Sequence, residues 1–396
     1  MESQAAPTAL PAQPFFSTPQ QRLALARQRY FEEGVRPSGL VGEGVIQSWS
    51  RCVQARRDPD EALAFDVVTH SRVQSALMRS RLLLQNAALE LSALERTLAG
   101  TACAVLLTDP QGVVVHAART GPDPDGALMR VAGRVGVCLS EHAIGTNAPG
   151  VTAHTGLPSV VLGGEHFFNC AQVLQCAAAP IRDIHGRIAG VLDVSCEGRE
   201  FGFDAAAVVG LHATAIENRL LCAQSTEHIV VRMQTSLALL DTPLEGLLGV
   251  TGDGRIAWLN GAAARLLGIR QPAPALDAEA ALGLDLHGLN STTRRLEATP
   301  HRLPSGLNVW LLARMQSHNG APGTVYGGSG WAGARDAPTR RSAASAGEPV
   351  LTLRDTDLHL VEQAVQACNG NVSQAARRLG VSRGLVYRHL KHARTR

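Results

Sequence analysis

The stretch that decides the C-terminal fold is Asp355-Thr-Asp-Leu-His-Leu-Val-Glu-Gln-Ala-Val-Gln-Ala-Cys-Asn-Gly-Asn-Val-Ser-Gln-Ala-Ala-Arg-Arg-Leu-Gly-Val-Ser-Arg-Gly-Leu-Val-Tyr-Arg-His-Leu-Lys391. A first helix is expected over Thr356–Cys368, because the threonine side chain accepts from the free N–H groups of a first helical turn. A second helix is expected over Asn371–Leu379, and Gly380 ends it in the left-handed conformation that glycine adopts without strain. Ser382 caps a third helix. The stretch therefore predicts three short helices joined by tight turns.

The last two of these helices have the arrangement of a helix-turn-helix. Small Ala375 and Ala376 let them approach closely, and the third helix presents basic residues in its first turns. Between Arg354 and Arg396 the chain has eight basic residues against three acidic ones, a local surplus of five. Such a surplus suits a phosphate backbone, so we predict DNA binding. The alternatives are a basic helical hairpin packed on the body of the protein, and charge that serves only solvation.

This stretch resembles the DNA-binding domain of the factor for inversion stimulation (Fis), which also ends many bacterial enhancer-binding activators. The resemblance is carried by Gly370-Asn371, Ala375-Ala376, the run from Leu379 to Gly384, Tyr387-Arg388 and Leu390-Lys391. It implies that the base-reading residues are Ser382, Arg383, Gly384 and Tyr387. It implies that the phosphate contacts come from Asn371, Ser373, Gln374, Arg388 and Lys391. Domains of this family act as dimers. The resemblance therefore implies that this chain forms a homodimer and binds double-stranded DNA at an inverted repeat.

Three strand–turn–strand units lie earlier in the chain, at residues 104–116, 178–195 and 247–260. In the first unit the turn is Asp109-Pro110-Gln111-Gly112, where proline fixes φ and glycine permits a positive φ. Units of this kind predict antiparallel hairpins and an α+β fold class. Residues 21–98 and 204–240 have apolar positions spaced three and four apart, which predicts helices.

The N-terminal half also resembles the sensory region of acetoin- and glycerol-type activators. The matching pieces are Ser48–Cys52, Asp58-Pro59, Gly136–Glu141, Ile144–Asn147, Gly164–Phe167, Cys176–Ile181, Gly186-Arg187 and Gly190–Asp193. This resemblance implies a GAF-like domain followed by a PAS-like domain, two folds that enclose small ligands. It places the ligand contacts on Cys138, Thr146, His166 and Phe167. The effector class that it implies is an alcohol, a ketone or a polyol.

The chain is therefore expected to be multidomain, with antiparallel-sheet sensor domains followed by an all-α domain. The predicted segments are a disordered N-terminus at 1–20, a helical N-terminal region at 21–79, a GAF-like sensor domain at 80–225, a connecting helix at 226–240, a PAS-like domain at 241–315, a flexible linker at 316–348 and the helix-turn-helix domain at 349–396. The linker prediction depends on seven glycines without any periodicity.

Lys391 is the single lysine of the chain. A phosphate-binding P-loop needs a lysine, so the sequence excludes this type of ATP site. Full-length activators of this class carry a central ATPase that remodels polymerase bearing the nitrogen-type sigma factor, sigma-54, and here the glycine-rich linker stands in its place. We expect a regulator that cannot itself activate that polymerase. It would work by DNA occupancy, by contact with RNA polymerase, or by pairing with a full-length activator. The alternative is an interaction protein that dampens such an activator.

Two groups of reactive residues allow other interpretations. Metal-ligand and acid–base residue types occur at Glu141, His142, Glu165 and His166. Neighbouring residues on a strand point to opposite faces, so at most half of these four converge, and a structural or ligand-pocket role is favoured. Cys170 and Cys176 would form a redox pair, but the eight cysteines show no Cys-x-x-Cys spacing, which favours buried thiols. No catalytic residue, metal or cofactor is expected, and the chain is predicted not to be an enzyme.

The N-terminal residues show no basic segment followed by an apolar one, and no apolar run approaches the ~18 residues of a membrane span. We therefore expect a cytoplasmic protein without a membrane partner, and reduced thiols. Aromatic residues make up only 4% of the chain, which argues against an aromatic cage.

Overall fold

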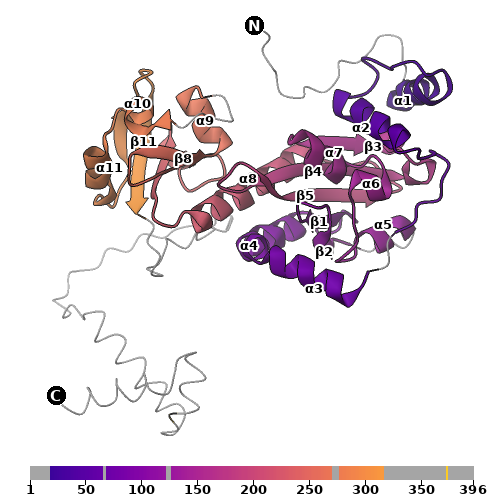
Figure 1. Ribbon diagram of the computed structural model, residues 1–396, viewed down its shortest axis with the longest axis horizontal. Coiled ribbons are helices and arrows are strands. Elements are labelled where there is room, and N and C mark those ends of the chain that lie inside the picture. The colour runs from indigo at the N-terminus through magenta and orange to yellow at the C-terminus, as the bar shows by residue number, and fades with distance from the viewer. Residues whose placement is uncertain (1–17, 66–67, 122–125, 270–275, 316–371, 373–396) are drawn as a thin grey trace, which may run out of the picture. The chain divides into compact units, whose positions relative to one another are not determined.

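The computed structural model describes residues 18–65, 68–121, 126–269, 276–315 and 372, and every structural statement below concerns these residues. They form two sheets with helices on their faces (Figure 1). The paired strands of both sheets run antiparallel, which confirms the α+β fold class. The residues predicted to contact DNA lie outside the described residues.

Helices come first. They are α1 (Pro19–Arg27), the π-helical turn η1 (Gln28–Glu32), α2 (Glu43–Gln54), α3 (His70–Arg79) and α4 (Arg81–Thr97). The helical prediction for 21–98 misses the breaks that follow η1 and α2. Gly34 at the first break and Arg56 at the second have φ values of 65° and 59°, and a right-handed helix cannot continue through them. The predicted disorder of 1–20 is wrong at its end, because α1 begins at Pro19, where Thr18 Oγ1 accepts from the Gln21 N–H.

The first sheet has the strand order β2-β1-β5-β4-β3. The elements are β1 (Ala104–Thr108), β2 (Val114–Arg119), α5 (Ala127–Ala132), α6 (Glu141–Ile144), α7 (Ala148–Thr155), β3 (Ser159–Leu162), the 3-10 turns η2 (Gly163–Glu165) and η3 (Asn169–Ala171), β4 (Leu174–Arg182), β5 (Ile188–Glu197) and α8 (Ala205–Gln224). Both predicted hairpins are present, as β1–β2 and β4–β5. The first turn closes because Asp109 Oδ1 accepts from the N–H groups of Gln111 and Val113.

The two faces of this sheet bury different side chains, because successive strand residues point to opposite sides. One face packs against α4 and α8 in an apolar core that includes Leu107, Leu192 and Val194. The other face packs against α2 and α7 in a core that includes Val191. Asp193 is buried on this second face, between the apolar positions of β5. The N-terminal helices thus share a core with the first sheet.

The second sheet has the strand order β10-β11-β6-β7-β8-β9. The elements are β6 (Ile229–Gln234), the 3-10 turn η4 (Leu237–Leu239), β7 (Gly246–Val250), β8 (Arg255–Leu259), α9 (Gly261–Leu267), β9 (Leu276–Asp277), α10 (Ala278–Leu282), α11 (Leu286–Thr293), β10 (Thr299–Arg302) and β11 (Asn308–Met315). The third predicted hairpin is β7–β8. Leu248, Leu289 and Leu311 are completely or almost completely buried in the core beneath the helices.

The predicted connecting helix at 226–240 is wrong. Helix α8 ends at Gln224, and residues 229–234 form β6 between β7 and β11. Glu227 has a φ of 66°, which stops helical continuation. The following Ile-Val-Val run is β-branched, and such side chains lose rotamer freedom in a helix but fit a pleated sheet.

Candidate functional site

A buried carboxylate lies on the face of the first sheet that α2 and α7 cover. Asp193 on β5 is 1% exposed. Its Oδ2 accepts a hydrogen bond from Ser195 Oγ at 2.7 Å, whereas Oδ1 has no hydrogen-bond partner among the described residues. Burial raises the pKa of Asp193 to about 7, against a smaller lowering by the Ser195 hydrogen bond. An unpartnered buried oxygen costs about 1–3 kcal/mol, so a donor that reached Oδ1 would be bound favourably.

A second unpartnered oxygen lies on the neighbouring strand. Thr108 Oγ1 on β1 is buried and accepts or donates no hydrogen bond within the described part of the chain. The strand register pairs Leu106 with Asp193 and Thr108 with Val191, so Thr108 is the diagonal neighbour of Asp193 on the same face. Diagonal neighbours lie about 7–8 Å apart, a distance that one small molecule with two polar groups can span.

A histidine and a thiol continue this polar row across β4. Cys176 lies opposite Ser195 in the sheet, and its Sγ is 3.4 Å from His166 Nε2. His166 Nδ1 lies 3.0 Å from the Gly163 carbonyl oxygen, to which it donates when the proton is on Nδ1. Burial lowers the pKa of His166 to about 4 and raises the pKa of the Cys176 thiol. Both groups are therefore neutral at pH 7, and the row offers hydrogen bonds without a fixed charge.

Helix α2 closes the outer side of this region through Thr146. The Thr146 hydroxyl lies 2.7 Å from Ser48 Oγ and 3.8 Å from Cys52 Sγ, both on α2. The preceding Gly145 has a φ of 66°, and a side chain there would meet the Phe168 ring at 2.9 Å. The loop can thus approach α2 closely because residue 145 is glycine.

Arg27 on α1 holds the loop that carries His166. Its Nη1 donates to the Gly164 and His166 carbonyl oxygens at 3.0 and 2.7 Å, and its Nη2 donates to the Phe167 carbonyl oxygen at 3.1 Å. Charge-assisted hydrogen bonds of this kind are stronger than neutral ones. Arg27 is thus a positioning residue for the loop, and no pattern in the sequence pointed to it.

Glu141 fixes α6 to its neighbours. Its carboxylate accepts from Arg51 Nε and Nη2 at 2.7 and 2.8 Å, and His154 Nε2 lies 3.3 Å from the same group. These partners come from α2 and α7, so the contacts join three helices over the sheet. The bidentate geometry gives Glu141 a structural role and leaves it no free oxygen for catalysis.

The scarce aromatic residues gather beside this site. The cluster consists of Tyr30, Phe31, Trp49, Phe167 and Phe168, with ring centroids 5.0–5.5 Å apart along its contacts. Phe167 is completely buried within it. The rings pack on one another, so the cluster is a core that stabilises the loop and not an open cage.

A surface pocket of about 640 Å³ lies between α1, β3 and the start of α8. Glu165 lines it, and burial raises the pKa of this carboxyl to about 7. Arg22 also lines it, with a buried Nε that has no partner in the described ranges. Volumes of 300–1,000 Å³ are typical of small-molecule pockets. The pocket is separate from the Asp193 row, since none of the row's residues line it.

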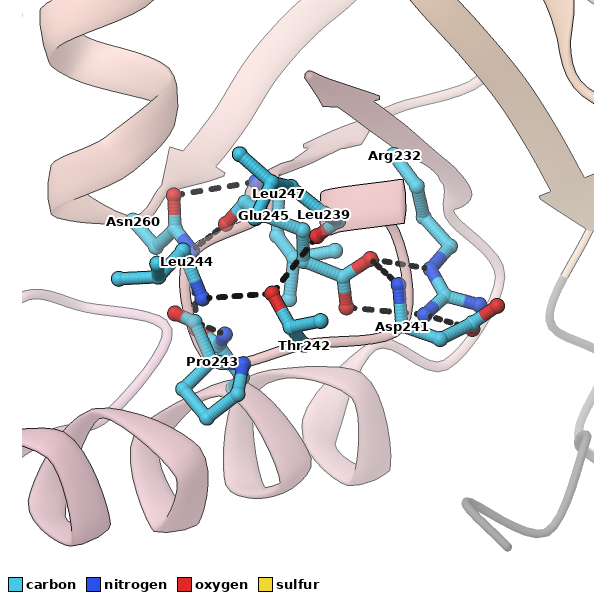
Figure 2. A network of polar contacts seen from close by, with 10 residues as sticks. Arg232, Leu239, Asp241, Thr242, Pro243, Leu244, Glu245, Leu247 and Asn260 are labelled. Atoms are coloured by element: carbon cyan, nitrogen blue, oxygen red, sulfur yellow. Dashed lines mark hydrogen bonds and ion pairs between the residues drawn. The ribbon is translucent and has the colours of Figure 1, made fainter. Parts of the chain in front are cut away.

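Helix α8 is joined to the second sheet by a network of buried polar groups (Figure 2). Asn260 Nδ2 donates to Asn218 Oδ1 on α8 at 2.8 Å and to the Glu245 carbonyl oxygen at 2.9 Å. The Glu245 carboxylate accepts from Arg232 Nε and Nη2 at 3.0 and 2.9 Å. Asp241 donates its backbone N–H to the same carboxylate. The network therefore connects the helix that packs on the first sheet with strands of the second.

Two stretches of the chain match known protein families. Residues 18–213 match the family described as MimR, N-terminal domain, and residues 352–392 match the family described as bacterial regulatory protein, Fis family. The propane 2-monooxygenase operon activator MimR of Mycolicibacterium goodii is 27% identical over 73% of this chain and 46% of its own length. The acetoin catabolism regulatory protein of Cupriavidus necator is 30% identical over 56% of this chain and 34% of its own length.

The chain is a homologue of these transcriptional regulators. It combines a MimR-type N-terminal domain with a Fis-family segment, as the sequence resemblance implied. The acetoin dehydrogenase operon activator AcoR of Bacillus subtilis, another relative, is 29% identical over 43% of this chain and 28% of its own length. This homologue thus spans less than half the length of the three relatives named here. All three are regulators and not enzymes.

The structure brings together three of the four residues that were predicted to contact a ligand. Thr146, His166 and Phe167 lie around the loop and helix that face the polar row, and all three are buried. Cys138 lies elsewhere, beside the β1–β2 turn, where its Sγ contacts Ser140 Oγ at 3.3 Å. Sequence reasoning missed Asp193 as a site residue, although an acid inside the apolar run of β5 was the available signal.

Of the other reactive residues, Glu141 and Glu165 have separate partners. The Cys170 thiol contacts the Glu61 carbonyl oxygen, and Cys176 contacts His166. Within the described ranges, no three His, Cys, Asp or Glu side chains are grouped so as to hold a metal ion. In the same part of the chain, no helix has the length and apolar character needed to span a bilayer.

Proposed function

We propose that this chain is a DNA-binding transcriptional regulator that responds to a small effector. The observation that carries the proposal is the joining of a Fis-family segment to a MimR-type domain in which a buried carboxylate oxygen has no partner. The Fis-family segment supplies the contacts to double-stranded DNA. Domains of this type act as dimers, so the operator is an inverted repeat. The base-reading residues are Ser382, Arg383, Gly384 and Tyr387.

The effector binds on the sheet face beneath α2 and α7. Asp193 Oδ1 and Thr108 Oγ1 both lack partners there, so the effector carries a hydroxyl donor and a second polar group. The neighbouring groups are neutral, and the surrounding core is apolar, so a small uncharged alcohol, ketone or polyol fits best. One relative is the activator of an acetoin dehydrogenase operon, and acetoin is a hydroxyketone of this class. Cys138 stays outside this site.

The signal leaves the first sheet through α8. Glu217 on α8 accepts from the Arg182 N–H of β4, and Asn218 bonds to Asn260 beside the second sheet. An effector that fits one arrangement of the sheet and α8 better than another shifts the population toward it. The change in the second sheet then alters how two DNA-binding segments pair or contact RNA polymerase.

The regulator does not drive sigma-54 polymerase on its own, because its sequence has no P-loop lysine. It acts instead by occupying DNA, by contacting RNA polymerase, or by pairing with a full-length activator. The last possibility, a heterodimer that dampens such an activator, is the second candidate function. The observation that favours it is the match to less than half of each relative's length.

DNA binding is tested by genome-wide immunoprecipitation of the tagged chain beside a variant truncated before Leu351. Discrete peaks that disappear on truncation support the regulator, and peaks that depend on a neighbouring full-length activator support the second candidate. In vitro, Arg383→Ala should weaken the recovered site by roughly 1–3 kcal/mol and flatten its sequence preference. Lys391→Ala should weaken all DNA about equally. Unchanged specific binding by Arg383→Ala contradicts the assignment of the reading helix.

Effector binding is tested by calorimetry with small alcohols, ketones and polyols. Asp193→Asn is expected to weaken the binding that wild type shows, because the carboxylate offers two acceptor oxygens and the amide only one, for which Ser195 and the effector then compete. Arg22→Gln is the matched control, since Arg22 lines the separate pocket of about 640 Å³. Loss of binding in Arg22→Gln but not in Asp193→Asn would move the effector to that pocket.

A further inference from the structure

Two cysteines that are far apart in the sequence are neighbours in the first sheet. Strands β1 and β5 are antiparallel, and their register pairs Ala104 with Ser195. The next position along this register places Cys103 opposite Cys196. Both side chains enter the apolar core on the α4 and α8 side, and both are buried. Directly opposed residues have Cα atoms about 4.5–5.5 Å apart, which lies inside the range of disulfide-bonded cysteines.

The two thiols also contact each other, and the contact makes them unequal. The hydrogen bond from Cys196, with further help from Thr101 and Arg199, lowers the pKa of the Cys103 thiol to about 7 against the effect of burial. The same contact, together with burial, raises the pKa of Cys196. Cys103 is therefore the sulfur of the pair that loses its proton first. Only a thiolate is a good nucleophile toward an oxidant.

The pair lies close to the protein surface. Cys196 Sγ is 3.2 Å from the carbonyl oxygen of Arg199, and Arg199 is itself exposed. On the other side, Cys103 Sγ is 3.8 Å from the Thr101 carbonyl oxygen. Ala102, between them in the chain, has a φ of 56°, a left-handed conformation that alanine adopts only with strain. A small local opening of these turns exposes the thiols, and strained turns open at low cost.

We propose that Cys103 and Cys196 are an oxidation site, in which a hydroperoxide converts the two thiols into a cross-strand disulfide between β1 and β5. The Cys103 thiolate attacks one peroxide oxygen and the O–O bond breaks. Cys103 becomes a sulfenic acid, and the leaving hydroxide takes a proton to become water. The Cys196 sulfur then attacks the sulfenic sulfur, and its proton leaves with the hydroxyl group as a second water. Two thiols and one hydrogen peroxide thus give one disulfide and two waters.

The position of the pair connects oxidation to the regulator. Cys196 lies near the end of β5, and the chain then enters α8 at Ala205, which shares the same core. A disulfide fixes the spacing of β1 and β5 where α8 begins. Oxidation and effector binding therefore converge on the same helix, although the redox site does not depend on the proposed function. Disulfide chemistry also distinguishes this pair from Cys176, whose thiol contacts His166 and stays protonated.

The test uses the full reduced chain, treated with limiting hydrogen peroxide and then alkylated and digested with trypsin. The fragments 97–119 and 188–199 each contain one cysteine, so the disulfide appears as one linked pair that dithiothreitol separates. In the Cys196→Ser variant, which keeps a hydrogen-bond donor beside Cys103 and removes the resolving thiol, a sulfenic acid at Cys103 should be trapped by a 1,3-dione probe. In the Cys103→Ala variant, Cys196 should remain alkylatable. The exposed Cys170→Ala variant is the matched control, and it should keep the linked pair.

The proposal is overturned if wild type remains alkylated at both Cys103 and Cys196 after the peroxide has been consumed by Cys170. It is also overturned if either fragment is found linked to a different cysteine while the pair of 97–119 and 188–199 is absent. Far-ultraviolet circular dichroism of the reduced variants establishes that they are folded. The wild-type measurement needs no variant, so a misfolded variant does not leave the question open.

Discussion

Each sheet buries a carboxylate, and the two carboxylates differ in how completely their oxygens are hydrogen-bonded. Glu245 before β7 is completely buried and is met by two guanidinium nitrogens of Arg232 and the Asp241 N–H. Asp193 on β5 has one hydroxyl donor and one oxygen without a partner. No shift in the pKa of Asp193 comes from a nearby cation, whereas burial raises it to about 7.

The difference separates a structural group from a candidate binding group. A buried charge whose partners are all present stabilises one arrangement of the chain, and its removal leaves other groups unsatisfied. A buried group with a missing partner stabilises nothing in the free protein and gains most when a ligand arrives. The second sheet therefore supplies a rigid connection, and the first sheet supplies the adjustable site.

The largest expected effect on stability comes from breaking the buried ion pair of Arg232 and Glu245. Glu245→Ala removes both carboxylate contacts from the buried Arg232 guanidinium and should lower the free energy of unfolding by about 3–5 kcal/mol. Urea unfolding followed by circular dichroism measures this. Asp241→Asn is the control and should change stability by less than about 1 kcal/mol, because its side chain is exposed. Equal effects of the two variants would contradict the structural role of Glu245.

The next effect is a difference in pH dependence. The native pKa of Asp193, about 7, is above its ordinary value of 3.8, so the native state binds this proton more tightly than the unfolded state. The stability of wild type should therefore fall as pH rises from about 4 to 7. Asp193→Asn removes this contribution, so its unfolding free energy should gain about 3 kcal/mol relative to wild type between pH 5 and pH 8. Parallel pH profiles for the two proteins would show that Asp193 is not held near neutrality.

A smaller effect is expected where α8 meets the second sheet. Asn260→Ala removes the hydrogen bond to Asn218 and the acceptor for the Leu247 and Ala263 N–H groups, and should cost about 2 kcal/mol. The double variant with Asn218→Ala should cost less than the sum of the single variants, because the two side chains share one bond. Thermal unfolding of the four proteins measures this coupling, and strict additivity would mean that the bond contributes nothing.

The smallest effect has the opposite sign. Thr108→Val replaces an unpartnered buried hydroxyl by a methyl group of similar size and should raise the unfolding free energy by roughly 1 kcal/mol. Thr152→Val is the matched control, because Thr152 Oγ1 donates to the Ala178 carbonyl oxygen at 3.4 Å, and this variant should not gain stability. A loss of stability in Thr108→Val would indicate a partner for this hydroxyl and weaken the binding site proposed beside it.

The hairpins of both sheets were predictable because their signals are local. Turns such as Asp109–Gly112 carry their own hydrogen-bond acceptors and a glycine with positive φ, so nearby residues determine the geometry. The β6 strand was mistaken for helix because an apolar run without a turn fits either period. Its place between β7 and β11 is set by pairing with residues about 80 positions later, at 310–315, which no local pattern contains.

The site was predictable only in part for the same reason. The family pattern predicted Thr146, His166 and Phe167, which are buried in this part of the fold, and their role in ligand binding stays a prediction. The raised pKa of Asp193 depends on its burial, and its unpartnered oxygen depends on which donors the packed core brings near it. The neighbouring Ser195 supplies the one local hydrogen bond. The Fis-family segment was predictable from sequence alone, since its caps, glycines and basic residues are close together; its individual DNA contacts stay predictions.

The two attachments of α8 also constrain how this chain can vary among its homologues. Glu217 binds a backbone N–H at position 182, which any residue except proline provides, so this attachment does not itself select the side chain there. The Arg182 side chain is held separately, by the Gly156 and Gly186 carbonyl oxygens. Asn218 and Asn260 bind each other through side chains, and Asn260 Oδ1 also accepts from the Leu247 and Ala263 N–H groups, so position 260 tolerates change less than position 218. A stricter constraint at 260 than at 218 is therefore the evolutionary signature expected of this attachment.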